Sequence, residues 1–210
     1  MTRTDDAPIA PLGDAIPRRG GWLSRTLGHA VLRLLGWRVT GAFPNEPKLV
    51  MIGAPHTSNW DFVVALAAAF SLRLGFSWVG KHVLFRPAFG WFFRWLGGIP
   101  VDRRASHGFV QQMVGEFERR PRFLLAIAPE GTRKAVARWK TGFYHIAVGA
   151  GVPVVMVTFD SARKAVHVGP WLTPRGDLAA DLERILGLYT ERLGTPLLPS
   201  SGETENLANQ

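Results

Sequence analysis

Hydrophobic and polar positions alternate along the chain with two different periods, and this pattern predicts strands and helices in succession. Short apolar runs typical of strands occur at 37–43, 48–53, 76–79, 99–101, 122–128, 153–159 and 165–168. Apolar positions at helical spacing occur at 21–35, 62–70, 87–96, 106–119, 143–150 and 178–193. Strands that alternate with helices predict an α/β fold, with a mostly parallel central sheet flanked by helices.

Three local expectations refine this picture. The runs 37–43 and 165–168 are short, and we expect them at the edges of the sheet. The run 122–128 is apolar almost throughout, which is typical of a central strand buried on both faces. Residues 81–85 are expected to form a loop.

The ends of the chain differ in composition from its middle. Residues 1–20 are rich in Pro, Gly and charge and are expected to form a flexible tail. Residues 21–195 are expected to form a single domain, and 196–210 a disordered tail. The first helix of the domain, at 21–36, is amphipathic and basic, so it either packs on the domain or lies at a membrane interface.

A second unusual helix is predicted at 87–96, where aromatic residues surround the helix on nearly every side. Such a helix is either buried in the protein or inserted into lipid, and the pattern alone leaves both open. No uncharged apolar stretch reaches the roughly 20 residues that a spanning helix needs. The N-terminus lacks a charged segment followed by an apolar one, so an export signal is not expected.

Charge and cysteine usage narrow the function classes. The chain contains no cysteine, which excludes disulfides, thiolate zinc sites and a cysteine acyl-enzyme. The formal net charge is +9, and residues 1–104 carry 13 Lys or Arg against 6 Asp or Glu. A positive electrostatic field of this kind favours an anionic partner, either nucleic acid or a membrane surface. Eight Trp and thirteen Phe favour the membrane.

The first candidate for chemistry is a loop between the strand at 48–53 and the helix at 62–70. It contains His56 and Asp61, which are five residues apart. On one continuous helix they would lie roughly 140° apart and could not touch. They can meet only if the helix begins between them, and Ser58, a good N-cap residue, predicts that it does.

A carboxylate bonded to one imidazole nitrogen fixes the tautomer and leaves the other nitrogen to accept a proton. The pair His56 and Asp61 is therefore a candidate general base. The same residues have a simpler interpretation, because Ser58 and Asp61 also form a capping box.

Other polar residues also follow predicted strands: Lys81, Asp102-Arg103 and Glu130-Gly131-Thr132-Arg133. Ligands of a mostly parallel sheet bind at the carboxyl ends of its strands, so these residues should converge with His56. A His–Asp base beside several cations suits transfer to a hydroxyl group of an anionic substrate. The chain has no Gly-x-Ser-x-Gly elbow, P-loop or His-Glu-x-x-His motif.

Four sequence blocks carry a family resemblance. His56-Thr57-Ser58-Asn59-Trp60-Asp61 matches the His-x4-Asp block of the glycerolipid (lysophospholipid) acyltransferases, and Pro129-Glu130-Gly131-Thr132-Arg133 matches their Pro-Glu-Gly-Thr-Arg block. Residues 98–103 and 152–157 resemble the second and fourth blocks, in the right order. The chain thus resembles an atypical small member of this family, similar to 1-acyl-glycerol-3-phosphate acyltransferases.

The resemblance implies transfer of a fatty acyl group from a coenzyme A or acyl-carrier-protein thioester to a lysolipid hydroxyl. No acyl-enzyme, metal or further cofactor is implied. His56 would be the general base and Asp61 its orienting partner. Backbone N–H groups at the start of the helix after Ser58 are candidate oxyanion donors.

The resemblance also implies substrate-binding residues. Arg103 and Arg133 would bind the acceptor phosphate, and Glu130, Gly131 and Thr132 of the same block would complete the substrate site. From the residues alone, Lys81 and Lys140 are candidates for further phosphate contacts. From the residues alone, Arg133 has the alternative of an ion pair with Glu130, and Lys81 and Lys140 have the alternative of a solvated surface position.

The partners expected are a lysolipid acceptor, an acyl thioester donor and an anionic membrane surface, without nucleic acid. The expected location is the cytoplasmic side of the inner membrane, as a peripheral or monotopic protein. The remaining alternatives are an O-acyltransferase for another lysolipid, such as an amino-acid-containing one, and a non-catalytic basic membrane- or nucleic-acid-binding protein. Departures from the family blocks at Pro55, Pro100 and Met156 concern the acceptor side and permit a different acceptor.

Overall fold

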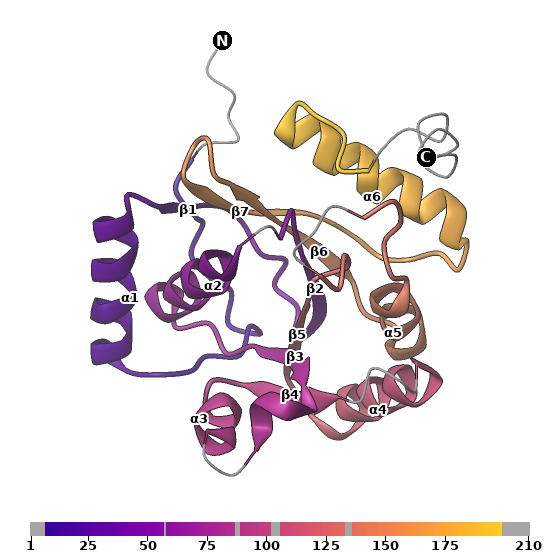
Figure 1. Cartoon of the computed structure of the whole chain (residues 1–210), viewed down its shortest axis with the longest axis horizontal. Helices are drawn as coiled ribbons and strands as arrows, with labels where there is room; N and C mark the ends of the chain where they lie inside the picture. The colour runs from indigo at the N-terminus through magenta and orange to yellow at the C-terminus, as the bar shows by residue number, and fades with distance from the viewer. Residues whose placement is uncertain (1–6, 57, 87–88, 102–105, 133–135, 199–210) are drawn as a thin grey trace.

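The structure is a computed structural model that describes residues 7–56, 58–86, 89–101, 106–132 and 136–198 (Figure 1). Its strands are β1 (Arg38–Gly41), β2 (Lys48–Ala54), β3 (Ser77–Lys81), β4 (Gly98–Val101), β5 (Phe123–Ile127), β6 (Val154–Asp160) and β7 (Ala165–Leu172). Its helices are α1 (Trp22–Leu35), α2 (Asn59–Leu72), α3 (Gly90–Trp95), α4 (Ser106–Arg119), α5 (Gly142–Ala150) and α6 (Leu178–Leu193), with a 3-10 turn η2 (His82–Phe85).

The described strands form one sheet in the order β1-β7-β6-β2-β5-β3-β4. Neighbouring strands run parallel, except that β6 and β7 pair antiparallel. The predicted α/β fold with a mostly parallel sheet is therefore confirmed. Strand β1 lies at an edge, as predicted from 37–43, and β5 lies in the interior of the sheet.

Two local predictions about the strands are wrong. The segment 165–168 does not close an edge, because β7 continues to Leu172 and pairs with β1 on its other side, Arg38 opposite Ala165. The segment 81–85 is not a loop throughout, because β3 extends to Lys81 and η2 follows it. Both errors arise because strand pairing depends on distant partners, which a local pattern does not contain.

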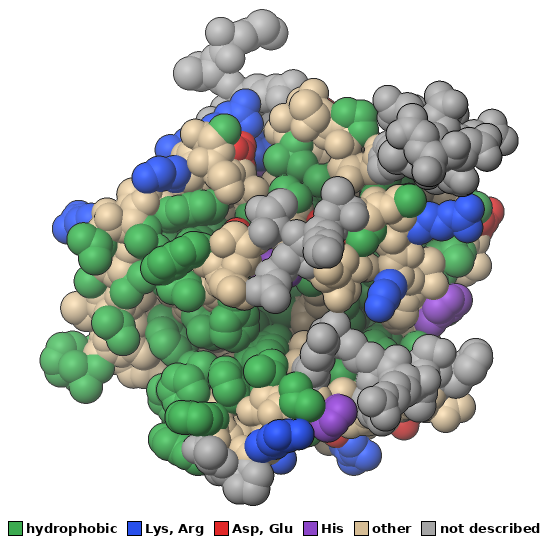
Figure 2. Space-filling model, in the orientation of Figure 1, with side chains coloured by type: hydrophobic (Ala, Val, Ile, Leu, Met, Phe, Trp, Pro, Cys, Tyr) green, Lys and Arg blue, Asp and Glu red, His purple; other side chains and the backbone are tan. Residues whose placement is uncertain are grey.

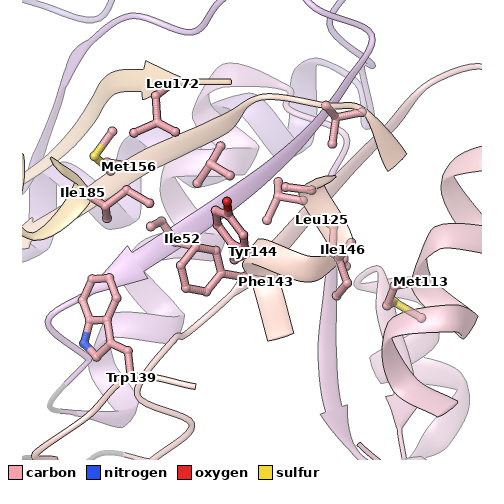
Figure 3. Close-up of a cluster of buried hydrophobic side chains, with 14 of the residues drawn as sticks. Ile52, Met113, Leu125, Trp139, Phe143, Tyr144, Ile146, Met156, Leu172 and Ile185 are labelled. Atoms are coloured by element: carbon pink, nitrogen blue, oxygen red, sulfur yellow. The ribbon is translucent and has the colours of Figure 1, made fainter. Parts of the chain in front are cut away.

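Helices cover both faces of the sheet (Figure 1). Helices α4, α5 and α6 pack on one face, where Phe117, Phe143 and Tyr189 are almost fully buried. Figure 3 shows the centre of this core, with Ile52 of β2 beside Phe143 and Tyr144 of α5. Alternating strand residues point to opposite faces, so both faces of β2 are buried and the strand is held firmly in register.

Helices α1 and α2 pack on the opposite face, through Leu32, Val64 and Val166 among others. Gly28 lets the two helices approach closely, because a Cβ built there would lie 2.4 Å from the Ser71 nitrogen and 2.6 Å from the Ala67 oxygen. The predicted amphipathic helix is thus present as α1, and one side of it packs on the domain. Among the described residues, no helix combines the length and the apolar character needed to span a bilayer.

The expectation that residues 1–20 form a flexible tail is wrong for residues 8–20. Leu12 and Ile16 are buried in the core beside Leu49, and the Ile9 N–H group donates to the Val39 carbonyl at 3.2 Å. The density of proline and charge predicted disorder. Leu12 and Ile16 instead pack on a part of the sheet that α1 and α2 leave uncovered. Residues 1–6 and 199–210 lie outside the described part of the chain, and Leu197 and Leu198 pack partly buried against the core.

We expect Gly28→Ala to destabilise the protein by about 1–3 kcal/mol, because the new methyl group would push α1 away from α2. Urea denaturation would measure the free energy of unfolding. Gly187→Ala is the matched control, since Gly187 is exposed on α6 with no atom within 4 Å of an added Cβ. It should stabilise the helix by up to ~1 kcal/mol. Equal effects of the two substitutions would contradict the close packing of α1 on α2.

Candidate active site

Helix α2 begins immediately after the loop that carries His56. Ser58 is its N-cap: the Ser58 hydroxyl accepts the Trp60 N–H group at 3.1 Å, and the Asp61 carboxylate accepts the Ser58 N–H group at 2.7 Å. This is the capping box that the sequence predicts. It turns the chain between His56 and the helix, so His56 is not part of the same helical spiral as Asp61.

The turn brings the two side chains together. His56 Nδ1 lies 3.3 Å from Asp61 Oδ2, and the His56 side chain is 24% exposed whereas that of Asp61 is 6% exposed. The buried carboxylate therefore favours a proton on Nδ1, which makes Nε2 the nitrogen that can accept a proton. Asp61 Oδ2 contacts both the helix cap and the imidazole, so the two interpretations of this aspartate describe one arrangement.

Glu130 joins this pair from the neighbouring strand. Strands β2 and β5 are paired in parallel, with Ile52 opposite Ile127, so the loops that follow them lie side by side. Both carboxylate oxygens of Glu130 lie 3.2 Å from the His56 backbone nitrogen, whose N–H group they accept. The structure thus gives Glu130 a contact with the chain at His56 and fixes the position of the loop that carries the base.

Burial raises the pKa of Glu130 above its ordinary value. The His56 N–H group opposes this shift by stabilising the carboxylate, and the nearby negative charge of Asp61 adds to it. The two carboxylates are therefore electrostatically linked.

The residues after Glu130 form a tight turn. Gly131 has φ +65°, a conformation that favours glycine, and its N–H group donates to the Ala128 carbonyl at 3.0 Å. The Lys140 side chain passes over this glycine, since a Cβ built on Gly131 would lie 3.0 Å from Lys140 Cδ and Cε. Thr132 is exposed at the end of the turn. Lys140 thus lies near the predicted substrate-binding block.

The other predicted site residues are only partly placed. Lys81 is the last residue of β3, and β3 and β4 continue the same parallel set, so its backbone lies at the same edge of the sheet as the ends of β2 and β5. The Lys81 side chain, Asp102, Arg103 and Arg133 lie outside the described part of the structure. The described residues that converge are His56, Asp61, Glu130 and Gly131.

The expectation that N–H groups at the start of α2 stabilise an oxyanion is wrong for two of them. The Trp60 N–H group donates to the Ser58 hydroxyl, and the Asp61 N–H group donates to the Ser58 carbonyl at 3.3 Å. The helix cap at Ser58 therefore already accepts the N–H groups of Trp60 and Asp61. The expectation that Met156 affects the acceptor side is also wrong. Its side chain is 1% exposed and packs in the core of the domain.

Tyr189 of α6 was not singled out from the sequence. Its hydroxyl donates to the Ile52 carbonyl at 2.6 Å and also lies 3.3 Å from the Val157 carbonyl. The Ile52 carbonyl lies near the carboxyl end of β2, so Tyr189 supports the strand from which His56 emerges. Burial raises the pKa of Tyr189, and it stays protonated. The sequence pattern that could identify Tyr189 is a polar hydroxyl on the buried side of an amphipathic helix.

The mostly parallel sheet places a His–Asp pair after a buried central strand, an arrangement whose geometry suits general-base catalysis. Residues 37–160 match the family model described as Acyltransferase. The chain therefore belongs to the acyltransferase family, which confirms the resemblance seen in the sequence blocks.

Proteins similar to this chain include two bacterial enzymes. The 1-acyl-sn-glycerol-3-phosphate acyltransferase of Escherichia coli (strain K12) is 29% identical over 157 residues, covering 68% of this chain and 62% of that protein. The protein of the same name from Salmonella typhimurium is 31% identical over 123 residues, covering 55% of this chain and 48% of that protein. The chain thus matches about half to two thirds of the length of these relatives.

A solved structure has a similar fold. The 1-acyl-sn-glycerophosphate acyltransferase of Thermotoga maritima superposes with a TM-score of 0.53 at 18% identity, over 81% of this chain and 78% of that chain. At this identity the similarity concerns the fold alone.

The raised pKa of Glu130 predicts a pH-dependent effect on stability. A carboxyl group whose pKa is raised by folding stabilises the fold while it is protonated, and this contribution is lost as the pH rises through the raised pKa. Glu130→Gln keeps an oxygen acceptor for the His56 N–H group but never becomes charged. We expect it to increase the free energy of unfolding relative to the native protein more at about pH 7 than at about pH 4.

Urea denaturation at both pH values would measure this difference. Glu183→Gln, at an exposed position of α6, is the control for the substitution itself. A difference between the Glu130 variant and the native protein that stays constant with pH would contradict the assigned environment of Glu130.

Proposed function

We propose that this protein transfers a fatty acyl group from an acyl thioester to a hydroxyl of a lysophospholipid such as 1-acyl-glycerol-3-phosphate. The observation that carries the proposal is the contact of His56 Nδ1 with the Asp61 carboxylate, in a chain that belongs to the acyltransferase family. The names of the relatives from Escherichia coli and Salmonella typhimurium support the acceptor. The donor is a coenzyme A or acyl-carrier-protein thioester.

In the proposed reaction His56 Nε2 takes the proton of the acceptor hydroxyl as its oxygen attacks the thioester carbonyl carbon. The tetrahedral intermediate then collapses, the carbon–sulfur bond breaks, and the imidazolium returns the proton to the leaving thiolate. Asp61 holds the ring and stabilises its transient positive charge. The acceptor is acylated directly, so the reaction needs no acyl-enzyme.

The acceptor phosphate is proposed to bind near the loop that follows β5. Arg103 and Arg133 are assigned to it because guanidinium groups match phosphate oxygens in geometry as well as charge. The position of Lys140 over Gly131 supports a phosphate site in this loop, since it adds a further cation beside the turn. The protein is proposed to act as a peripheral protein on the cytoplasmic side of an anionic membrane.

His56→Ala should lower kcat/KM for acyl transfer on the order of 100- to 10,000-fold, because it removes the general base. The measurement is mass-resolved product formation from a labelled acyl thioester and a panel of lysolipids. His145→Ala is the matched control, since His145 is exposed on α5. Unchanged turnover by the His56 variant would disprove the mechanism, and equal loss in both variants would point to a general effect of the substitution.

Arg133→Ala should raise KM for a phosphorylated acceptor roughly tenfold to a hundredfold, because a charge-assisted hydrogen bond is lost. A phosphate-free lysolipid should be affected little. Arg138→Ala is the control within the same loop, because Arg138 is exposed there. If the phosphate-free acceptor loses as much activity as the phosphorylated one, Arg133 does not bind the phosphate.

A further inference from the structure

Helix α2 is apolar on nearly every side, although it lies at the surface of the domain. Its inner side packs through Val64, Ala67 and Ala68 against the sheet and α1. On its outer side, Val63 is exposed and Phe70 is partly exposed. A helix with two apolar sides, only one of which is covered by the domain, normally faces a second apolar phase.

Helix α1 extends this apolar surface. Its packing side contains Gly28 and Leu32, whereas Leu23, Leu27 and Leu34 lie within roughly 40° of one another on a different side and are all exposed. Leu34 is 86% exposed. Leu23, Leu27 and Leu34 therefore do not pack in the core of this domain.

Helix α3 carries exposed aromatic side chains next to this surface. Trp91 is 68% and Trp95 is 59% exposed, and Phe89 immediately before the helix is also exposed. Phe92 stacks on Trp95 with ring centroids 6.1 Å apart. Packed rings that remain in water on one side are typical of side chains that lie at the headgroup level of a bilayer.

A groove of about 560 Å³ connects the three helices, with walls that include Trp22 and Leu27 of α1, Phe70 of α2 and Trp95 of α3. Figure 2 shows hydrophobic side chains gathered over the part of the molecule where α1, α2 and α3 lie in Figure 1. The exposed apolar residues thus form one continuous surface, which we name the α1–α3 face.

The charged residues in the segments that form most of the α1–α3 face are basic. Segments 15–45 and 62–101, which contain α1, α3 and most of α2, carry nine Lys or Arg and no Asp or Glu. Arg19 donates to the Trp95 carbonyl, and Arg73 Nε donates to the Gly20 carbonyl at 3.1 Å, so both exposed arginines lie at the rim of the groove. An apolar surface surrounded by cations complements an anionic phospholipid bilayer.

We propose that the α1–α3 face inserts into the headgroup region of an anionic phospholipid bilayer, with α3 as an aromatic anchor beside α1. This inference rests on the proposed function, because it specifies the surface by which the enzyme reaches its lipid substrate. Helix α2 begins at the His56–Asp61 pair and has its outer side on this face. Docking therefore brings the first turn of α2, next to His56, close to the bilayer, where exposed Trp60 adds a further aromatic contact.

The test is flotation of the purified full chain with vesicles of phosphatidylcholine alone or with added phosphatidylglycerol, without acyl donor. We expect binding to the anionic vesicles that weakens as salt is added. Trp91→Ala/Trp95→Ala should weaken the partition coefficient on the order of tenfold or more, because two indole rings no longer enter the interface. Trp171→Ala is the matched control, since Trp171 is 46% exposed on β7, outside the α1–α3 face.

Circular dichroism would establish that each variant is folded, and Trp91→Ala alone provides a milder variant with the same expected direction. Deletion of α1 is unsuitable, because Leu32 belongs to the core. The proposal is overturned if the double variant floats like the native protein, if neutral and anionic vesicles bind equally, or if the native chain forms dimers through this face and does not float.

His56→Ala separates this inference from the proposed function. It should float like the native protein because His56 is not part of the α1–α3 face. If it floats normally but retains full acyl transfer, the proposed mechanism fails and the docking surface stands. If native protein acylates a short-chain soluble acceptor but does not float, the docking surface fails and the function stands.

Discussion

The start of helix α2 is the constraint on which the site depends. One carboxylate, that of Asp61, accepts the Ser58 N–H group and contacts His56 Nδ1. The energy that stabilises the helix terminus therefore also fixes the orientation of the imidazole. Because the carboxylate is buried, it has little freedom to turn towards water, and the His56 imidazole is held in place.

The second support of the base comes from parallel strand pairing. Strands β2 and β5 place their loops side by side, and Glu130 binds the His56 backbone from the neighbouring loop. Tyr189 adds a contact from α6 to the carbonyl of Ile52 in β2. The chain that carries His56 is thus fixed by its own helix cap, by the adjacent loop and by the last helix, which lie far apart in the sequence.

The two groups of helices differ in how far their apolar side chains are buried. Helices α4, α5 and α6 cover one face of the sheet and supply most of the large core side chains. Helices α1, α2 and α3 leave apolar side chains exposed on the other side, with Arg19 and Arg73 at the rim of the groove between them. Because Asp61 lies in the first turn of α2 and α2 belongs to this second group, the partner of His56 and the proposed lipid-facing surface share one rigid element.

The sequence by itself determined the alternation of elements, the helix start at Ser58 and the meeting of His56 with Asp61, because these depend on residues close together in the chain. It did not determine that Glu130 binds the His56 backbone, that Tyr189 supports β2, or that Leu12 and Ile16 are buried. It also left open whether the rings of α3 are covered. Each of these depends on which distant segments become neighbours, and only the packing of the whole sheet decides that.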